Sequence, residues 1–319
     1  MMLNCTLLDD YQNVALTLAD WSSLYPAVQT RSLQQHLADD ESLIAMLADS
    51  DILVVMRERT PLTAARLAQL PRLKLIVTSG MRNAAIDLDA CRARGIAVCG
   101  TASSSAPPLE LTWGLLLALA RHIVPENQAL RAGGPWQQHL GLALEGKTLG
   151  LIGLGKIGGG MAKVAQAFGM RVCAWSQNLT SQRAAECGVE LMPSLAALLA
   201  VSDVVSLHLV LSERTRHLLD AAALAQMKPG ALLINTARAG LVDQQAMLAA
   251  LRSGPLAGAA LDVFETEPLP ASHPLRQLPN VLATPHLGYV ADDNYRRYFA
   301  QAVEDIAAWL RHQPLRSLL

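Results

Sequence analysis

The sequence predicts an α/β protein in which helices cover parallel β-strands. Uninterrupted apolar runs such as Ile52–Met56 are typical of strands that are buried on both faces. Stretches with helical spacing follow most of these runs, and that alternation favours parallel strands joined by crossover helices. Pro107-Pro108 interrupts the alternation, and a second series of the same kind starts at Thr148. We therefore expect two α/β domains.

The first series contains four predicted strands. Val14 and Leu18 continue a helical spacing after the first strand, and Thr60-Pro61 predicts a helix with Pro61 at its first position. A helix over Ile86–Arg94 is followed by Gly95, a common C-terminal cap. The predicted strands are Cys5–Leu8, Ile52–Met56, Leu73–Thr78 and Ile96–Cys99.

A long helical stretch from Leu109 to about Arg131 connects the two series. About six parallel strands follow, and helices fit between most of them. The periodic tail Ala291–Leu310 predicts a helix without a partner strand, so we expect it to fold back on the first domain. This organisation predicts one domain of residues 1–103 plus 287–319, with a domain of residues 104–286 inserted. The predicted strands are Thr148–Gly153, Arg171–Trp175, Val204–Leu209, Ala231–Asn235, Gly258–Leu261 and Val281–Thr284.

Composition narrows the possible partners and compartments. The formal net charge is -1 and no basic stripe occurs, so we expect no nucleic-acid partner. The longest apolar run, Leu115–Ala120, is too short to span a bilayer, and acidic residues near the N-terminus do not suit a signal peptide. Cys5, Cys99 and Cys173 lie in apolar runs and no CxxC pair occurs. We expect buried thiols, no metal site and a cytoplasmic location.

A glycine-rich turn follows the first strand of the second series. It reads Gly153-Leu154-Gly155-Lys156-Ile157-Gly158 and leads into a predicted helix over Met161–Phe168. In a dinucleotide-binding turn the first glycine permits the tight turn, the second admits the pyrophosphate and the third allows close helix–strand packing. Free N–H groups at the helix N-terminus favour phosphate. The turn predicts dinucleotide binding.

The choice between NAD and NADP stays open. An acidic residue about 20 positions after the turn normally receives the ribose hydroxyls of NAD. Here the next strand ends at Ser176-Gln177-Asn178, without an acid. No arginine stands at the strand tip to attract a 2′-phosphate, and Arg183 is the nearest candidate.

Three polar clusters follow later strands, at the sheet edge where ligands bind in open α/β folds. They contain Arg238, Glu267 and His286. An arginine fork can bind a carboxylate at two points. A histidine can protonate a ketone oxygen, and a neighbouring carboxylate orients the imidazole and favours its protonated form. These groups suit the reduction of a 2-keto acid.

The chain resembles the D-isomer-specific 2-hydroxyacid dehydrogenase family, which includes phosphoglycerate dehydrogenases and glyoxylate or hydroxypyruvate reductases. The stretches LEGKTLGLIGLGKIG, MKPGALLINTARAGLVD, GAALDVFETEPLP and NVLATPHLG match its signatures in order. The resemblance implies a Rossmann-type domain inserted into a flavodoxin-like substrate domain. It also implies hydride transfer between NAD(P)H and a small 2-keto acid.

The resemblance assigns roles to residues of both domains. It makes Arg238 a substrate ligand, His286 the general acid/base and Glu267 its partner, while Asp262 would hold the nicotinamide carboxamide. Other implied cofactor ligands are Gly153, Gly155, Lys156, Ile157, Gly158, Ser176, Thr236, Ala237 and Gly288.

In the first domain, the backbone N–H groups of a glycine-rich loop would bind the substrate carboxylate, and this loop is Ser79-Gly80-Met81-Arg82-Asn83. Arg57 and Arg59 match a segment that faces the substrate phosphate in some relatives. Arg82 stands where the family usually has glycine, which leaves the substrate open. The active site would lie in a cleft between the two domains.

An alternative hypothesis belongs to another class of function. Some relatives sense nucleotides in transcription, and such a protein would bind the cofactor without useful turnover. A homodimer is expected from the family and from the apolar helix around Leu109–Ala120.

Overall fold

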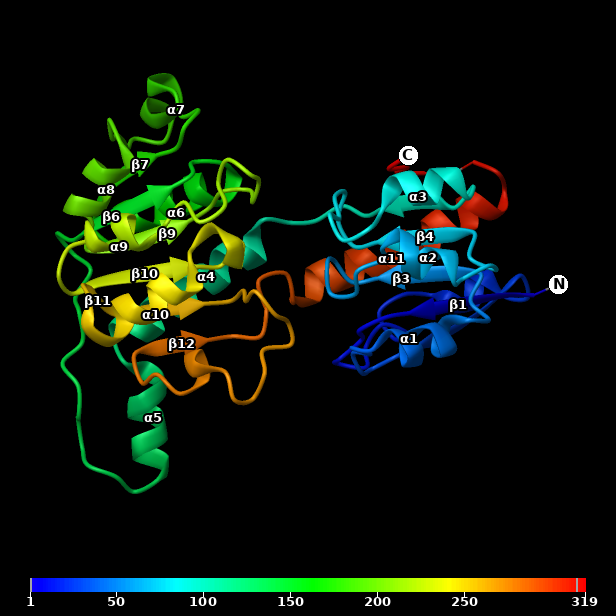
Figure 1. The fold of residues 1–319 in the computed structure, drawn as a ribbon, viewed down its shortest axis with the longest axis horizontal. Helices are drawn as coiled ribbons and strands as arrows, with labels where there is room; N and C mark the ends of the chain where they lie inside the picture. The colour runs from blue at the N-terminus through cyan, green and yellow to red at the C-terminus, as the bar shows by residue number, and fades with distance from the viewer. Residues whose placement is uncertain (1, 314) are drawn as a thin grey trace. The chain divides into compact units, whose positions relative to one another are not determined.

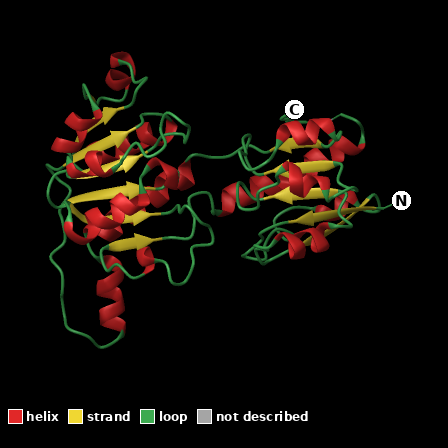
Figure 2. Ribbon diagram, viewed as in Figure 1, coloured by secondary structure: helices red, strands yellow, loops and turns green. Residues whose placement is uncertain are grey.

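The computed structural model describes residues 2–313 and 315–319, which form two compact units. Unit 1 comprises Met1–Ser104 and Ala291–Leu319, and unit 2 comprises Ser105–Val290. The inserted domain was predicted to end at residue 286, and unit 2 ends at Val290. In both units the strands of a parallel sheet are flanked by helices (Figures 1 and 2). The predicted α/β class is therefore confirmed.

Unit 1 is built on a five-stranded parallel sheet in the order β2-β1-β3-β4-β5. Alternate residues of its strands point to opposite faces, so Leu53 packs under α1–α3 while Val54 lies beside Phe299 of α11. The strands are β1 (Leu3–Leu7), β2 (Val28–Ser32), β3 (Ile52–Val55), β4 (Leu75–Thr78) and β5 (Ala97–Gly100). The helices are η1 (Trp21–Leu24), α1 (Asp40–Leu47), α2 (Ala64–Ala68), α3 (Leu88–Ala93) and α11 (Asp292–Leu310).

Two helix predictions in unit 1 are wrong. The segment around Val14 forms turns, because the Asp10 carboxylate accepts hydrogen bonds from the N–H groups of Val14 and Ala15. The helix predicted to start at Pro61 begins at Ala64, where the Thr63 hydroxyl caps it by accepting from Arg66 N–H. In both segments, a side chain accepts hydrogen bonds from nearby backbone N–H groups, and these bonds determine the local structure.

Unit 2 is built on a seven-stranded parallel sheet in the order β12-β11-β10-β9-β6-β7-β8. The prediction of about six strands did not include the two-residue edge strand β8. The strands are β6 (Thr148–Ile152), β7 (Arg171–Trp175), β8 (Glu190–Leu191), β9 (Val204–Leu207), β10 (Ala231–Asn235), β11 (Leu256–Leu261) and β12 (Val281–Ala283).

Helices cover both faces of this sheet. Val204 faces the cluster formed with α4 and α6, whereas the adjacent Val205 faces the cluster formed with α8, α9 and α10. Each fully buried aliphatic side chain of this kind contributes about 1.5–3 kcal/mol. The helices are α4 (Ala106–Ala120), α5 (Ile123–Arg131), α6 (Lys156–Ala167), α7 (Ser181–Glu186), α8 (Leu195–Val201), α9 (Ala221–Ala225) and α10 (Gln244–Ser253), with the short turns η2 (Ala239–Leu241) and η3 (Pro274–Arg276).

The single helical stretch predicted from Leu109 to Arg131 is wrong. Helix α4 already begins at Ala106, with both prolines in its first turn, where their missing N–H groups cost nothing. It ends at Ala120, and His122 takes a left-handed conformation with φ of 52° before α5 begins. Helix α5 buries none of its residues and projects from the edge of unit 2 (Figure 1).

Candidate functional site

The glycine turn lies between β6 and α6, and helix α6 starts directly at Lys156. Gly153 has φ of +101°, and a Cβ placed there would lie 2.6 Å from the carbonyl oxygen of His208. A Cβ at Gly158 would lie 2.2 Å from the Gly153 carbonyl oxygen. Both glycines are therefore required for strand–helix packing inside the unit.

Gly155 differs from its two neighbours in the turn. It is exposed, and a Cβ placed there would meet no atom of the described residues within 4 Å. Lys156 and Ile157 form the first turn of α6, where backbone N–H groups have no partner inside the helix. The open space over Gly155 at this helix end fits a dinucleotide pyrophosphate.

Beyond the tip of β7 lies a surface pocket of about 150 Å³. Ser176, Gln177 and Asn178 line one side of it, as expected for the ribose end of a dinucleotide site. Arg214, from the loop after β9, lines it as well and donates from Nη2 to Gln177 Oε1 at 2.6 Å. No local pattern indicates this arginine, because it lies 37 residues from its partner in the chain.

The residues after β10 are held by Asn235. Its Oδ1 accepts from Ala237 N–H at 3.1 Å, and its Nδ2 donates to the Arg238 carbonyl oxygen at 3.0 Å. The Thr236 hydroxyl is 2.7 Å from that of Thr112 in α4. This network fixes the backbone from which the Arg238 side chain extends, and Arg238 Nη1 donates to the Ala237 carbonyl oxygen.

His286 and Glu267 form a hydrogen-bonded pair. The distance from His286 Nδ1 to Glu267 Oε2 is 2.6 Å, and Glu267 Oε1 accepts from Phe264 N–H at 2.8 Å. Burial raises the pKa of Glu267, but the hydrogen bond and charge of His286, the Phe264 N–H and the charge of Arg238 together hold it below its ordinary value. The structure thus brings Arg238, Glu267 and His286 together within unit 2.

His286 is held in an uncommon backbone conformation, with φ of 55°. The residues around it are anchored by Asp262, whose side chain is fully buried. Asp262 Oδ1 accepts from the Thr284 hydroxyl at 2.6 Å and from Leu287 N–H at 2.7 Å, while Oδ2 accepts from Gly288 N–H at 2.8 Å.

These bonds engage both carboxylate oxygens of Asp262 and the backbone N–H of Gly288, and both residues were predicted to contact the cofactor. Burial raises the pKa of Asp262, and its hydrogen bonds with Thr284, Leu287 and Gly288 oppose that rise. In this arrangement Asp262 holds the loop that carries His286.

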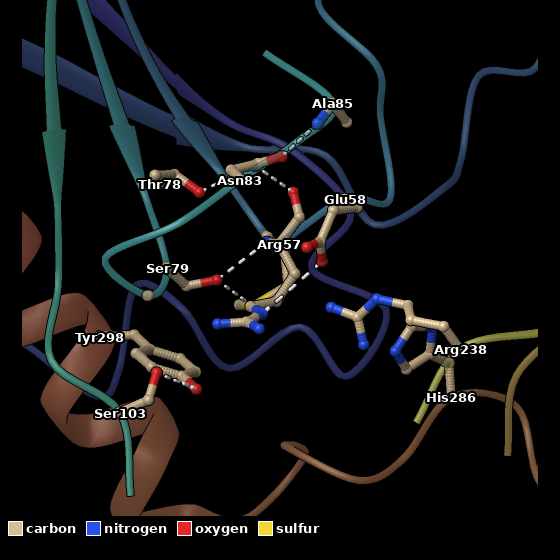
Figure 3. A network of polar contacts seen from close by, with 12 residues as sticks. Arg57, Glu58, Thr78, Ser79, Asn83, Ala85, Ser103, Arg238, His286 and Tyr298 are labelled. Carbon is tan, nitrogen blue, oxygen red and sulfur yellow. Dashed lines mark hydrogen bonds and ion pairs between the residues drawn. The ribbon is translucent and has the colours of Figure 1, made fainter. Parts of the chain in front are cut away.

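Unit 1 carries the second group of predicted site residues, at the end of β4 (Figure 3). Gly80 has φ of +90°, and a Cβ placed there would lie 2.0 Å from Arg57 Nη1, so the guanidinium rests directly on this glycine. Asn83 donates to the Arg57 carbonyl oxygen at 2.6 Å, and Ser79 Oγ accepts from Arg57 N–H at 2.9 Å. Asn83 is buried and positions the backbone of Arg57, a role that its place in the predicted loop did not indicate.

One part of the loop prediction needs correction. The Gly80 N–H is not available to a substrate, because it donates to Thr101 Oγ1 at 3.0 Å. Among the described residues, the N–H groups of Met81 and Arg82 have no hydrogen-bond acceptor, and both residues are exposed. These two N–H groups are the ones that can receive a ligand.

Arg57 and Arg59, which were predicted to face a substrate phosphate, have different surroundings in the structure. Arg59 Nη1 donates to the Asp9 carbonyl oxygen at 2.7 Å, and its guanidinium carbon lies 4.5 Å from the centroid of the Tyr11 ring. Arg59 therefore ties unit 1 together internally. Arg57 instead lies over the glycine loop, 3.7 Å from the Glu58 carboxylate.

No group of three or more His, Cys, Asp or Glu side chains in residues 2–313 and 315–319 is arranged to hold a metal ion. No helix in the same residues combines the length and apolar character that crossing a membrane requires.

A glycine turn on a doubly wound parallel sheet, with a histidine–carboxylate pair at the carboxyl ends of its strands, defines a class of dinucleotide-dependent enzymes. Comparison with known proteins identifies the family within this class. Residues 113–288 match the family described as D-isomer specific 2-hydroxyacid dehydrogenase, NAD binding domain. The chain belongs to this family of NAD(P)-dependent oxidoreductases.

Individual relatives agree with this assignment. The chain is 40% identical over 278 residues to a hydroxypyruvate reductase of Thermotoga maritima, covering 85% of this chain and 88% of that protein. It is 38% identical over 274 residues to a D-3-phosphoglycerate dehydrogenase of Methanocaldococcus jannaschii, covering 85% of this chain but only 52% of that protein, so it spans about half the length of this relative.

Solved structures show the same fold. A phosphoglycerate oxidoreductase from Vibrio cholerae superposes with a TM-score of 0.92 at 39% sequence identity, covering 98% of this chain and all of that chain. The expected two-domain Rossmann-type architecture is confirmed. The comparisons do not favour the alternative of a nucleotide-sensing protein without turnover.

Proposed function

We propose that this protein interconverts a small 2-keto acid and the corresponding D-2-hydroxy acid, with NAD(P)(H) as co-substrate. The observation that carries the proposal is the 2.6 Å contact between His286 Nδ1 and Glu267 at the carboxyl edge of the dinucleotide-binding sheet. A histidine held in this way can exchange a proton with a substrate oxygen, which is what the reaction requires besides hydride.

The proposed chemistry divides between cofactor and protein. Bound NAD(P)H supplies the hydride that adds to the carbonyl carbon. The protein supplies the proton: Nδ1 of His286 faces Glu267, so Nε2 is the atom that donates to the substrate oxygen during reduction and accepts the proton during oxidation. Glu267 holds the orientation of the imidazole through its hydrogen bond with Nδ1. The aspartate of a serine–histidine–aspartate triad plays the same role, because its carboxylate also orients a histidine.

The acid group of the substrate needs cationic and N–H partners. We propose that the guanidinium of Arg238 binds the substrate carboxylate, because an arginine fork matches its two oxygens. In unit 1, the Met81 and Arg82 N–H groups and the Arg57 guanidinium form a second group of anion-binding donors. Relatives named for hydroxypyruvate, phosphoglycerate and (S)-sulfolactate all act on small acids, which supports a substrate of this class.

Initial rates of NADH and NADPH oxidation test the proposal. The panel contains glyoxylate, hydroxypyruvate, phosphohydroxypyruvate, pyruvate and bulkier 2-keto acids. Saturable oxidation that depends on one of these acids is the expected result. If NADH or NADPH binds tightly and no 2-keto acid is reduced, the proposed reaction is wrong and a binding function gains support.

We also propose that the protein is a homodimer assembled through α5 and the segment that follows it. Helix α5 buries none of its residues, and Trp136 and Leu140 are 78% and 97% exposed. Large apolar side chains exposed together favour a protein–protein interface, and a second copy of this chain offers a matching apolar face. Sedimentation velocity should give a dimer, and Trp136→Ser combined with Leu140→Ser should shift it to monomer. A monomeric wild-type protein would refute this assembly.

A cytoplasmic location is the remaining proposal. All five cysteines are free thiols, and four of them are buried. Unpaired thiols are typical of proteins from reducing compartments.

A further inference from the structure

The pocket at the tip of β7 has a composition that bears on the form of the cofactor. A carboxylate at this position in NAD-specific proteins accepts the two ribose hydroxyls and repels a 2′-phosphate. None of the residues that line this pocket is Asp or Glu. The first residue after β7 is Ser176, whose hydroxyl can donate to a phosphate oxygen as readily as to a hydroxyl.

The pocket also contains a positive charge that no carboxylate neutralises. Arg214 binds the neutral amide of Gln177 at 2.6 Å, and it forms no ion pair with any of the residues that the structure describes. The acid before it in sequence, Glu213, does not line the pocket. The guanidinium is therefore fixed at the strand tip with its charge available to an anion.

Arg183, the arginine that sequence position favours, is already engaged elsewhere. Its Nε donates to the Leu154 carbonyl oxygen at 3.1 Å, and its Nη1 is 3.3 Å from the Glu186 carboxylate. It does not line the pocket. Arg214 is the arginine that does.

We propose that this pocket binds the 2′-phosphate of NADPH and that Arg214, with Ser176, makes the protein prefer NADPH over NADH. The inference rests on the proposed function, since it names the cofactor form for the same reaction. A guanidinium and a hydroxyl are groups that commonly bind phosphate, and the missing acid removes the repulsion that an NAD-specific pocket would exert.

Binding of nucleotide fragments tests the inference without turnover. Calorimetric titration of the full chain with adenosine 2′,5′-bisphosphate and with 5′-AMP compares ligands that differ only by the 2′-phosphate. We expect the bisphosphate to bind at least about tenfold more tightly, because a charge-assisted contact is worth about a factor of ten or more. Equal affinities for the two fragments would overturn the inference.

Three variants identify the residues responsible. Arg214→Gln should weaken the bisphosphate and NADPH by about ten- to a hundredfold and leave NADH within about threefold of its wild-type affinity. Ser176→Glu should reverse the preference toward NADH. Arg252→Gln removes the same charge from the exposed last turn of α10 and should change neither affinity. An equal effect of Arg214→Gln and Arg252→Gln would mean that only overall charge matters, and would refute the site.

The outcomes for the two proposals are distinguishable. If NADH is bound and oxidised with a 2-keto acid while the 2′-phosphate gives no advantage, the specificity inference fails and the proposed reaction stands. If neither NADH nor NADPH binds, both fail.

Discussion

Replacing Asp262 with asparagine should slow turnover while cofactor affinity is retained. Asp262 is fully buried and accepts three hydrogen bonds, from the Thr284 hydroxyl, Leu287 N–H and Gly288 N–H. In the variant, the Asn side chain can keep Oδ1 in its position, but its NH₂ group then faces Gly288 N–H, so two hydrogen-bond donors face each other. The variant loses one charge-assisted hydrogen bond and leaves a buried N–H without an acceptor.

The expected size follows from that bond. A hydrogen bond to a charged group contributes about 1.5–3 kcal/mol, and about 1.4 kcal/mol corresponds to a factor of ten. If this energy holds His286 in its left-handed conformation, its loss lowers the fraction of molecules with a competent loop by about ten- to a hundredfold. We therefore expect kcat to fall by about that factor, and the free energy of unfolding to fall by about 2 kcal/mol.

The assay compares kcat, the Kd of NADPH and urea unfolding for Asp262→Asn and for Asp203→Asn. Asp203 is a matched control, because its carboxylate also accepts from a backbone N–H, that of Thr148 at 2.8 Å, and pairs with Lys228, but it precedes β9 at the opposite edge of the sheet. Both variants should lose stability, and only Asp262→Asn should lose turnover. The reasoning is refuted if the two variants have the same kcat. A large rise in the Kd of NADPH with kcat preserved would instead support a direct carboxamide contact.

Three further predictions concern other parts of the chain. Burial lowers the pKa of His208 from 6.5 to about 4, so the unfolded chain takes up a proton that the folded chain excludes, and the free energy of unfolding falls as the pH drops from 6.5 toward 4. At about 1.4 kcal/mol per pH unit, the loss of stability between pH 7 and pH 5 in urea unfolding should be about 2 kcal/mol larger in the wild type than in His208→Gln. Equal losses in the two proteins would contradict this prediction. Gly158→Ala places a Cβ 2.2 Å from a backbone oxygen, so it should lower the free energy of unfolding by about 1–3 kcal/mol and weaken NADPH binding in a fluorescence titration. The control Gly114→Ala lies at an exposed helix position with no neighbour within 4 Å and should stabilise the protein slightly. Similar stabilities of the two variants would be evidence against the packing argument. Gly80→Ala should displace the Arg57 guanidinium and raise KM for the keto acid at least about tenfold with the Kd of NADPH unchanged, and an unaltered KM would remove the glycine loop from the proposed substrate site.

Much of the fold could be predicted because its strands are buried on both faces. Runs such as Ile52–Val55 contain no polar residue, so the apolar pattern that predicts a buried strand is uninterrupted. The strands that were missed, β2 and β8, lie at sheet edges and carry exposed or polar residues such as Gln29 and Glu190. The break between α4 and α5 was missed because His122, and not a glycine, takes the left-handed conformation there.

The candidate site was predictable where chemistry lies in contiguous motifs. Arg238, Glu267 and His286 stand in short recognisable stretches, and the structure brings them together. The contacts that position them join distant parts of the chain and leave no local pattern. Asp262 meets Gly288 across 26 residues and Arg214 meets Gln177 across 37, so neither role could be derived from spacing.

The central claim is that His286 transfers the substrate proton while Glu267 holds it in place. The most direct test measures kcat for keto-acid-dependent NAD(P)H oxidation by His286→Gln, together with cofactor Kd from fluorescence titration. Loss of a positioned acid/base typically lowers the rate by about 10²–10⁴-fold, and we predict a loss of this size with cofactor Kd within about threefold of the wild type. A variant that turns over within a few fold of the wild type would contradict the account.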